Sequence, residues 1–303
     1  MKQIMQLHRT IGLLILFFTT WVSGQNLELG VGGGLSAYNG DILPETFKFP
    51  RTSGFAGQVQ LSYYLNERFR IQLFYNRGRL TGSDADFDTT DRNLSFVTNI
   101  NEVGFRGFIN LIPFDTYGQQ GRPYTAYIGS GVSVYHFNPF TTNFQGQKVY
   151  LHEIGTAGQY LPEESGYPRP YNLFQVGIPI TAGISIAVTP NVILGMEVDY
   201  RVLFTDYIDD IGRDRNPNFD DLVLSNEQAA LLTNRSWELQ YDPSLGLNPI
   251  DVARQVYQNR NLGSGFRSVG TKNDVFGFIL FKVSYLLDDF SWGGKSRFGC
   301  YQF

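Results

Sequence analysis

The chain has little cysteine, no excess of basic charge and no apolar run long enough for a membrane-spanning helix. Its 303 residues include one cysteine, Cys300, so an internal disulfide framework is excluded. The 28 acidic side chains outnumber the 24 basic ones. This balance argues against nucleic-acid binding, which requires a basic patch. A spanning helix takes about 20 apolar residues, so a helical membrane protein is excluded as well.

The N-terminal residues are typical of a secretory signal peptide, which we assign to residues 1–24. Lys2 and Arg9 form the basic region, residues 11–18 the apolar region, and Ser23-Gly24 the small-residue exit. An uncleaved anchor is the alternative interpretation, but the apolar segment is too short to span a bilayer. Cleavage after Gly24 leaves an exported chain of 279 residues, with 22 basic and 28 acidic side chains and a net charge of −6.

Alternation of apolar and polar residues dominates the rest of the chain. Residues 192–204 show it most clearly, because one face is apolar throughout and the other carries Glu197, Asp199 and Arg201. A period of two predicts a β-strand. A soluble sheet with one solvated face fits this pattern, and so does a membrane barrel with lipid outside and a polar lumen inside.

The connections between the alternating runs distinguish these two possibilities. Eight runs occur, at residues 27–38, 55–65, 69–78, 102–111, 125–135, 174–188, 192–204 and 275–286. The connections after the even-numbered runs are short, and those after the odd-numbered runs are longer. Outer-membrane barrels combine short periplasmic turns with long extracellular loops and an even strand number. We therefore predict an all-β, antiparallel, up-and-down transmembrane barrel of eight strands over residues 25–287, with long extracellular loops.

Charged residues on the polar faces of these strands are predicted to fill the lumen. The predicted lumen charge network consists of Arg70, Glu102, Arg106, Glu197, Asp199, Arg201 and Lys282. Opposite charges packed inside about eight strands neutralise one another, so a plugged barrel is expected rather than a wide channel. We also expect a bulge before the fourth run, because Leu94–Ile100 has the opposite parity, and an irregularity at Pro179.

The longest connection, residues 207–272, is predicted to form an extracellular loop with short helices. Ser225 or Asn226 is expected to cap the first helix, and Asn248-Pro249 to begin the second. Loops of this length are usually functional or mobile. A self-packed surface lid and a dedicated binding surface are the two interpretations, and we favour the lid.

Acidic residues gather where the predicted strands reach the extracellular rim. They are Asp41, Asp206, Asp209, Asp210 and Asp274. Closure of the barrel makes the seventh, eighth and first strands neighbours, so these acids are expected to converge. Oxygen-rich clusters can hold Ca²⁺. We favour solvated acids that cap turns, and predict no metal and no cofactor.

Few residues suit catalysis. The exported chain has two histidines, His136 and His152. His152, Glu153 and Ser165 would form a triad only if the fold brought them together, because a triad is defined by geometry. No glycine-rich phosphate loop or metal-ligand spacing is present in the sequence, and we predict that the protein is not an enzyme.

A polar tail, residues 288–303, follows the last strand and is expected on the periplasmic side. Its Cys300 has no partner within the chain, which leaves intermolecular pairing or a free thiol as alternatives. A soluble protein or a lipoprotein would dock on this tail, so Cys300 is the predicted partner contact.

Three stretches resemble a known family: SAYNGDILP after the signal peptide, TDYIDDIG, and KNDVFGFILFKVSY before a tail with a late cysteine. Together they resemble the PorG-like outer-membrane barrels of Bacteroidetes, which are associated with type IX secretion and gliding. The signal-peptide exit VSGQ also suits that phylum. The resemblance implies a non-catalytic anchoring role, with outer-membrane lipids and periplasmic lipoprotein or ring subunits as partners, and it supplies no catalytic residues.

Two other functions remain open. The first is an independent small barrel that binds a ligand or a surface partner through its extracellular loops. The second is a lipid-modifying barrel enzyme.

Overall fold

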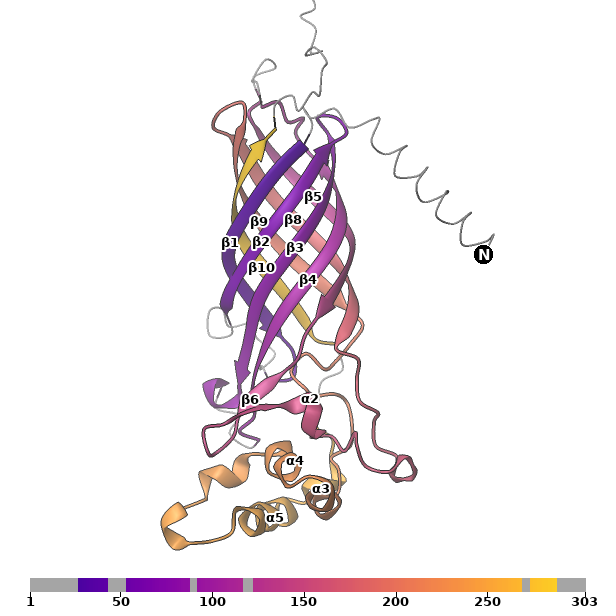
Figure 1. Cartoon of the computed structure of the whole chain (residues 1–303), viewed down its shortest axis with the longest axis vertical. Coiled ribbons are helices and arrows are strands. Elements are labelled where there is room, and N and C mark those ends of the chain that lie inside the picture. The colour runs from indigo at the N-terminus through magenta and orange to yellow at the C-terminus, as the bar shows by residue number, and fades with distance from the viewer. Residues whose placement is uncertain (1–26, 43–52, 88–91, 117–121, 269–272, 288–303) are drawn as a thin grey trace, which may run out of the picture.

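Eight long strands form a closed barrel in the computed structural model, which describes residues 27–42, 53–87, 92–116, 122–268 and 273–287. The strands are β1 (Leu27–Asn39), β2 (Gly54–Tyr64), β3 (Phe69–Ser83), β4 (Ser95–Asn110), β5 (Tyr124–His136), β8 (Phe174–Ala187), β9 (Val192–Leu203) and β10 (Val275–Leu286). Each pairs antiparallel with the next, and β10 pairs with β1 to close the ring (Figure 1). The predicted eight-stranded, up-and-down, all-β barrel is confirmed.

The two ends of the barrel differ. The helices and the longest loops lie at one end, the loop end, whereas β1 begins and β10 finishes at the other, the turn end (Figure 1). The predicted alternation of loop length is less strict than expected. Residues 84–94 form a connection no longer than residues 111–123, because β3 and β4 continue to Ser83 and Ser95 and shorten the loop between them.

Among the described residues, no helix has the length and apolar character needed to cross a membrane.

The outward-facing side chains of the strands form an apolar belt. Its members are 37–65% exposed and include Leu29, Val31, Leu73, Val103, Phe105, Ile109, Ile128, Val132, Ile180, Ile184, Met196, Val198, Phe281 and Val283. A soluble monomer rarely exposes a continuous apolar surface larger than a few hundred Å². A lipid environment accounts for this belt, since lipid-facing and lumen-facing residues alternate along the strands of a membrane barrel.

The register of β4 shows that the predicted bulge is wrong. The pairing with β3 runs unbroken from Ser83↔Ser95 to Phe69↔Ile109. Phe96 and Ile100 point inward and are buried in an apolar cluster near the loop end. The inward-facing residues of β4 are therefore apolar near the loop end and polar further along the strand. In the sequence, this change looks the same as the reversed alternation that a bulge produces.

Pro179 causes only a local break. The β5–β8 ladder runs from Tyr124↔Ile186 to Ser130↔Ile180 and resumes in the same register at Ser133↔Gly177. The predicted irregularity is therefore a gap in the pairing, without a shift in register.

The loop end is built from short elements. These are η2 (Asp84–Phe87), β6 (Phe140–Thr142), β7 (Lys148–Tyr150), α2 (Leu151–Ile154), η3 (Glu163–Ser165), α3 (Phe219–Ser225), α4 (Glu227–Thr233), η4 (Ser236–Leu239), η5 (Pro243–Leu245), α5 (Pro249–Asn259) and η6 (Leu262–Ser264). The β6–β7 hairpin extends the sheet beyond β4 through the pair Val97↔Phe140. The sequence pattern did not predict this hairpin.

Helices α3, α4 and α5, with the segments between them, form one packed unit, which we call the helical insert (residues 217–264). Its core surrounds Trp237, which is 1% exposed and donates from Nε1 to the Leu231 carbonyl at 2.9 Å. Asn226 caps α4 and Asn248 caps α5, with Pro249 in the first turn. Both predicted helices are therefore present, whereas α3, which Asn218 caps, was missed.

A narrow neck joins the helical insert to the barrel. Arg215 and Phe266 form an antiparallel bridge, and the Asn216 amide donates to the Gly265 carbonyl at 2.9 Å. Arg235 makes a second connection, since its Nη1 donates to Ser95 Oγ on β4 at 3.0 Å. The insert is thus a self-packed unit that is tied to the rim of the barrel.

Candidate functional site

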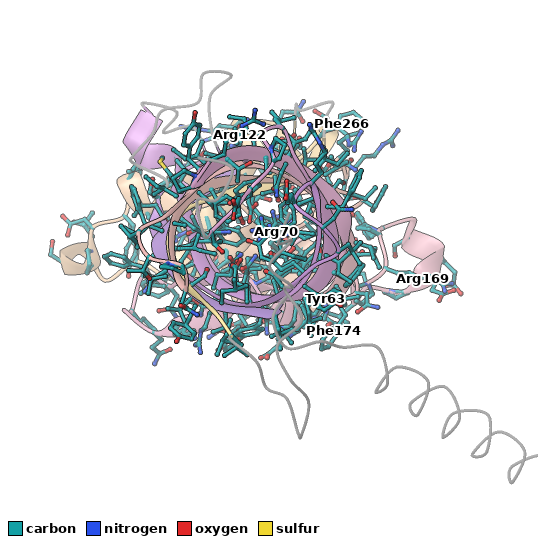
Figure 2. The ribbon with its side chains drawn as sticks, turned by 90° about the horizontal axis from the view of Figure 1, so that it is seen from above. Tyr63, Arg70, Arg122, Arg169, Phe174 and Phe266 are labelled. Atoms are coloured by element: carbon teal, nitrogen blue, oxygen red, sulfur yellow. The ribbon has the colours of Figure 1, made fainter. Side chains whose placement is uncertain are left out.

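All seven residues of the predicted lumen charge network lie inside the barrel, and none is more than 4% exposed. Viewed from above, side chains cross the interior of the ring, with Arg70 near its centre (Figure 2). The network residues belong to β3, β4, β9 and β10. Because side chains alternate across a strand, each inward charge is fixed by the parity of its strand.

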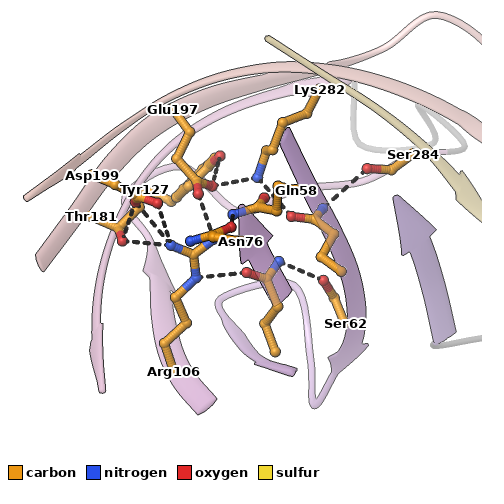
Figure 3. Close-up of polar contacts among 12 residues, drawn as sticks. Gln58, Ser62, Asn76, Arg106, Tyr127, Thr181, Glu197, Asp199, Lys282 and Ser284 are labelled. Atoms are coloured by element: carbon orange, nitrogen blue, oxygen red, sulfur yellow. Dashed lines mark hydrogen bonds and ion pairs between the residues drawn. The ribbon is translucent and has the colours of Figure 1, made fainter. Parts of the chain in front are cut away.

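Arg106 on β4 bridges two carboxylates of β9 (Figure 3). Its Nη2 lies 2.5 Å from Glu197 Oε1, and its Nη1 lies 2.9 Å from Asp199 Oδ1. Its Nε donates to Gln72 Oε1 at 2.6 Å. Lys282 on β10 binds the second oxygen of Glu197. The guanidinium therefore joins opposite walls of the barrel.

Arg201 on β9 forms a second centre in the network. It donates from Nε and Nη2 to both oxygens of Glu102 on β4, at 2.6 and 2.9 Å, and from Nη2 to Asp199 at 3.3 Å. Asn76 Nδ2 donates to Glu102 Oε2 at 2.9 Å. Two-pronged pairing of this kind is strong and fixes orientation, so Arg201 locks β9 to β4 across the lumen.

Arg70 occupies a separate environment nearer the turn end. Its guanidinium carbon lies 4.5 Å from the centre of the Phe108 ring and 4.6 Å from that of Tyr127. Its closest carboxylate is Glu28 at 3.8 Å, which also accepts a 2.5 Å hydrogen bond from Tyr64. Glu28 was not predicted as a network residue, although its place on the inward face of β1 was a sufficient signal.

The lumen network is electrically balanced. Within the described strands it contains four cations, Arg70, Arg106, Arg201 and Lys282, and four anions, Glu28, Glu102, Glu197 and Asp199. Aromatic rings fill the lumen between these charged side chains and pack directly against the backbone of the strands. A Cβ atom added at Gly104 would lie 2.5 Å from the Phe74 ring. The interior is therefore a charged but neutralised and closely packed plug.

The predicted acidic residues at the rim are buried, so the interpretation as solvated acids is wrong. Asp209 and Asp210 are 1% exposed and Asp274 is fully buried, while Asp206 is 8% exposed and Asp41 is half-buried. The reason is that residues 205–212 pack inward at the mouth of the barrel, where all of them are buried except the half-buried Tyr207. Ile208 and Ile211 there join the apolar cluster at the loop end.

Four of these acids converge. Tyr38 on β1 donates to Asp209 Oδ2 at 2.5 Å and lies 3.2 Å from Asp274 Oδ1. Asp41, Asp206 and Asp274 place carboxylate oxygens within 4.8 Å of one another. We call Asp41, Asp206, Asp209 and Asp274 the rim cluster.

Asp210 belongs to a different set of contacts. It accepts a hydrogen bond from Tyr171 at 2.8 Å and another from Thr156, and it lies 3.7 Å from Arg267. Arg267 also donates to Thr156 Oγ1 at 2.7 Å. Asp210 therefore ties the β9–β10 connection to the loop between β5 and β8.

Burial and mutual repulsion shift the ionisation of the rim cluster. Burial and, second to it, the nearby Asp41 carboxylate together raise the pKa of Asp209 to about 8. Burial raises the pKa of Asp274 well above its usual range, and Asp209 and Asp206 add to this effect. Neighbouring carboxylates with little access to water resist ionisation together. The cluster therefore needs a counter-ion or bound protons near neutral pH.

The residues considered for a triad are not joined to one another in the described part of the chain. His152 Nε2 lies 2.9 Å from the Tyr171 carbonyl oxygen, and no hydrogen bond joins His152 to Glu153 or Ser165 in the described part of the chain. His136 packs against Phe174, with ring centres 4.8 Å apart. The signal peptide (residues 1–24) and the tail with Cys300 (residues 288–303) lie outside the described residues.

A closed antiparallel barrel with an apolar outer belt and a charged, packed interior is the fold of an outer-membrane β-barrel protein. Residues 7–237 match the family described as Domain of unknown function (DUF6089), and the chain belongs to this family. No protein of curated function is significantly similar to it in sequence.

Several solved barrels are similar in structure. Neisserial surface protein A is 14% identical, with a TM-score of 0.43, and the match covers 88% of this chain and 98% of that chain. The attachment invasion locus protein Ail of Yersinia pestis is 8% identical over 86% and 98% of the two chains, with a TM-score of 0.38. OprG of Pseudomonas aeruginosa is 10% identical over 86% and 96%, with a TM-score of 0.35.

Proposed function

We propose that this barrel is a non-catalytic outer-membrane anchor within a protein-secretion machinery of the type IX, gliding-associated kind. The observation that carries the proposal is the packed lumen, where Arg106 and Arg201 are fully buried and paired across the barrel. An interior filled in this way holds the strands of the barrel together and suits an anchoring role better than the passage of solutes through the lumen. The function of the protein then resides at its two ends.

The turn end is the side on which we place the machinery. Outer-membrane barrels keep their short turns in the periplasm. Residues 288–303 follow β10 at that end, so the tail and Cys300 would meet periplasmic lipoprotein or ring subunits. The resemblance of SAYNGDILP, TDYIDDIG and KNDVFGFILFKVSY to PorG-like barrels supports this choice of partner.

A second candidate function uses the loop end. The helical insert has a complete core of its own, yet it also exposes four leucines: Leu224 (88%), Leu239 (57%), Leu245 (65%) and Leu247 (51%). Apolar side chains left outside a finished core are typical of contact surfaces when they form a patch. This observation favours a barrel that binds a surface partner through its extracellular loops.

Deletion at each end distinguishes the two functions. In one variant the tail is removed after residue 287, and in the other a short Gly-Ser linker replaces residues 217–264 at the neck between Asn216 and Gly265. Tagged barrels are purified from gently solubilised outer membranes of the native host, with and without reductant, and the bound proteins are identified by mass spectrometry. We expect loss of periplasmic subunits only on tail deletion.

The converse result would contradict the anchor function. If the tail deletion retained every partner and the insert deletion released one, the protein would be a surface-binding barrel. A Cys300→Ser variant shows whether the thiol forms an intermolecular disulfide or stays free. A partner held by a disulfide would be lost from this variant, and it would also be lost from the wild-type protein in reductant.

A further inference from the structure

We propose that the rim cluster is a binding site for one Ca²⁺ ion, which Asp41, Asp206 and Asp274 coordinate. Their carboxylate oxygens lie within 4.8 Å of one another. Ca²⁺ binds oxygen ligands at about 2.3–2.6 Å, so two ligands on opposite sides of the ion are about 4.6–5.2 Å apart. The three carboxylates are therefore spaced to share one ion.

A buried carboxylate oxygen of Asp206 is an independent indication of a ligand. Its side chain is nine-tenths buried, and its Oδ2 accepts a 3.0 Å hydrogen bond from Arg213 Nε. Its Oδ1 is shielded from solvent and has no hydrogen-bond partner among the described residues. A buried carboxylate oxygen without a donor costs free energy, and a bound cation removes this cost.

The charge around the cluster also favours a cation. Among the described residues, Arg213, whose side chain is 48% exposed, pairs with Asp206. Arg92 donates to the backbone carbonyl of Asp41 at 2.7 Å and forms its ion pair with Asp84, outside the cluster. Asp209 and Asp274 share the Tyr38 hydroxyl and otherwise accept from the amides of Ile211 and Ile208. These donors are uncharged, so they orient the carboxylates without neutralising any negative charge. A divalent ion would neutralise two of the four carboxylates in the cluster.

The position of the site suggests what the ion would do. Asp41 follows β1, Asp206 follows β9 and Asp274 precedes β10, and these three strands are adjacent in the closed sheet. One ion would therefore join the start of the first loop to both ends of the connection that carries the helical insert. Ca²⁺ would fasten the base of the insert to the barrel, a role independent of which end binds the partner.

Direct measurement of Ca²⁺ binding tests the proposal. The full chain is refolded in detergent free of lipopolysaccharide, which itself binds divalent cations, and then depleted with chelator. Isothermal titration with CaCl₂ should show one saturable site per chain, and MgCl₂ should bind at least about tenfold more weakly, because Mg²⁺ demands short octahedral contacts of about 2.0–2.1 Å. The apparent melting temperature should rise with Ca²⁺ concentration.

Matched variants locate the site. Asp206→Asn and Asp274→Asn should each weaken Ca²⁺ binding by at least about tenfold, because each removes a charged ligand. Asp220→Asn, an exposed acid in α3 that pairs with Arg254, should leave binding unchanged. Heat-shifted electrophoretic mobility confirms that each variant is folded. The absence of saturable binding, equal affinity for Mg²⁺, or undiminished binding by both folded variants would overturn the proposal.

Discussion

Replacing Arg106 by methionine should lower the free energy of unfolding of the barrel by about 3–5 kcal/mol, the cost of leaving buried charges without their partner. Arg106 is fully buried and contacts Glu197 at 2.5 Å and Asp199 at 2.9 Å. Lys282 would still pair with Glu197, and Arg201 would remain 3.3 Å from Asp199. Asp199 would lose its shorter contact, and the lumen would hold one excess negative charge.

A surface arginine provides the matched control. Arg169 pairs with Glu163 at 2.9 Å, but both side chains are 79% exposed. Arg169→Met should therefore change stability by less than about 1 kcal/mol. Urea unfolding of the barrel in lipid vesicles, followed by the far-UV circular dichroism of its strands, measures both values.

A double variant tests the physical reason. Adding Asp199→Asn to Arg106→Met removes the excess charge, so it should recover part of the lost stability. Equal effects of Arg106→Met and Arg169→Met, or no recovery in the double variant, would show that the lumen network does not hold the barrel together.

Placing arginine on the apolar belt should also destabilise the barrel strongly. Val132 lies in the central part of β5 and is 53% exposed on the outer face. An arginine on the lipid face near the middle of a bilayer costs about 2–4 kcal/mol in barrel proteins. We expect Val132→Arg to lower the free energy of unfolding in vesicles by this amount.

The control is an equally exposed apolar residue that faces water. Leu245 in η5 is 65% exposed at the loop end. Leu245→Arg makes a similar chemical change there and should alter stability by less than about 0.5 kcal/mol. Similar costs at Val132 and Leu245 would mean that the outer belt does not face lipid.

Much of the barrel was predictable because a strand repeats every two residues. The parity of Glu197, Asp199 and Arg201 assigned them to the inner face before any contact was known. The partner of each charge could not be predicted. Glu102 and Arg201 are 99 positions apart, and which of the inward charges meet depends on the stagger of strands on opposite walls of the barrel.

The loop end was less predictable, because loops have no simple repeat. The acids of TDYIDDIG looked like solvated residues, and only the inward fold of this segment, with Ile208 and Ile211 in the apolar cluster, explains their burial. The false bulge in β4 has a related cause. Alternation reports the polarity of each face, and the inner face becomes apolar where the loops close over it.

Ionic conductance through the purified barrel in a planar lipid bilayer measures directly whether the lumen is closed. Folding and insertion are first verified by heat-shifted electrophoretic mobility. A barrel whose lumen is filled by the Arg106 and Arg201 networks should give no steady open current under an applied voltage. Stable, stepwise openings of the wild-type protein would contradict the packed lumen, and with it the proposal that this barrel acts through its two ends.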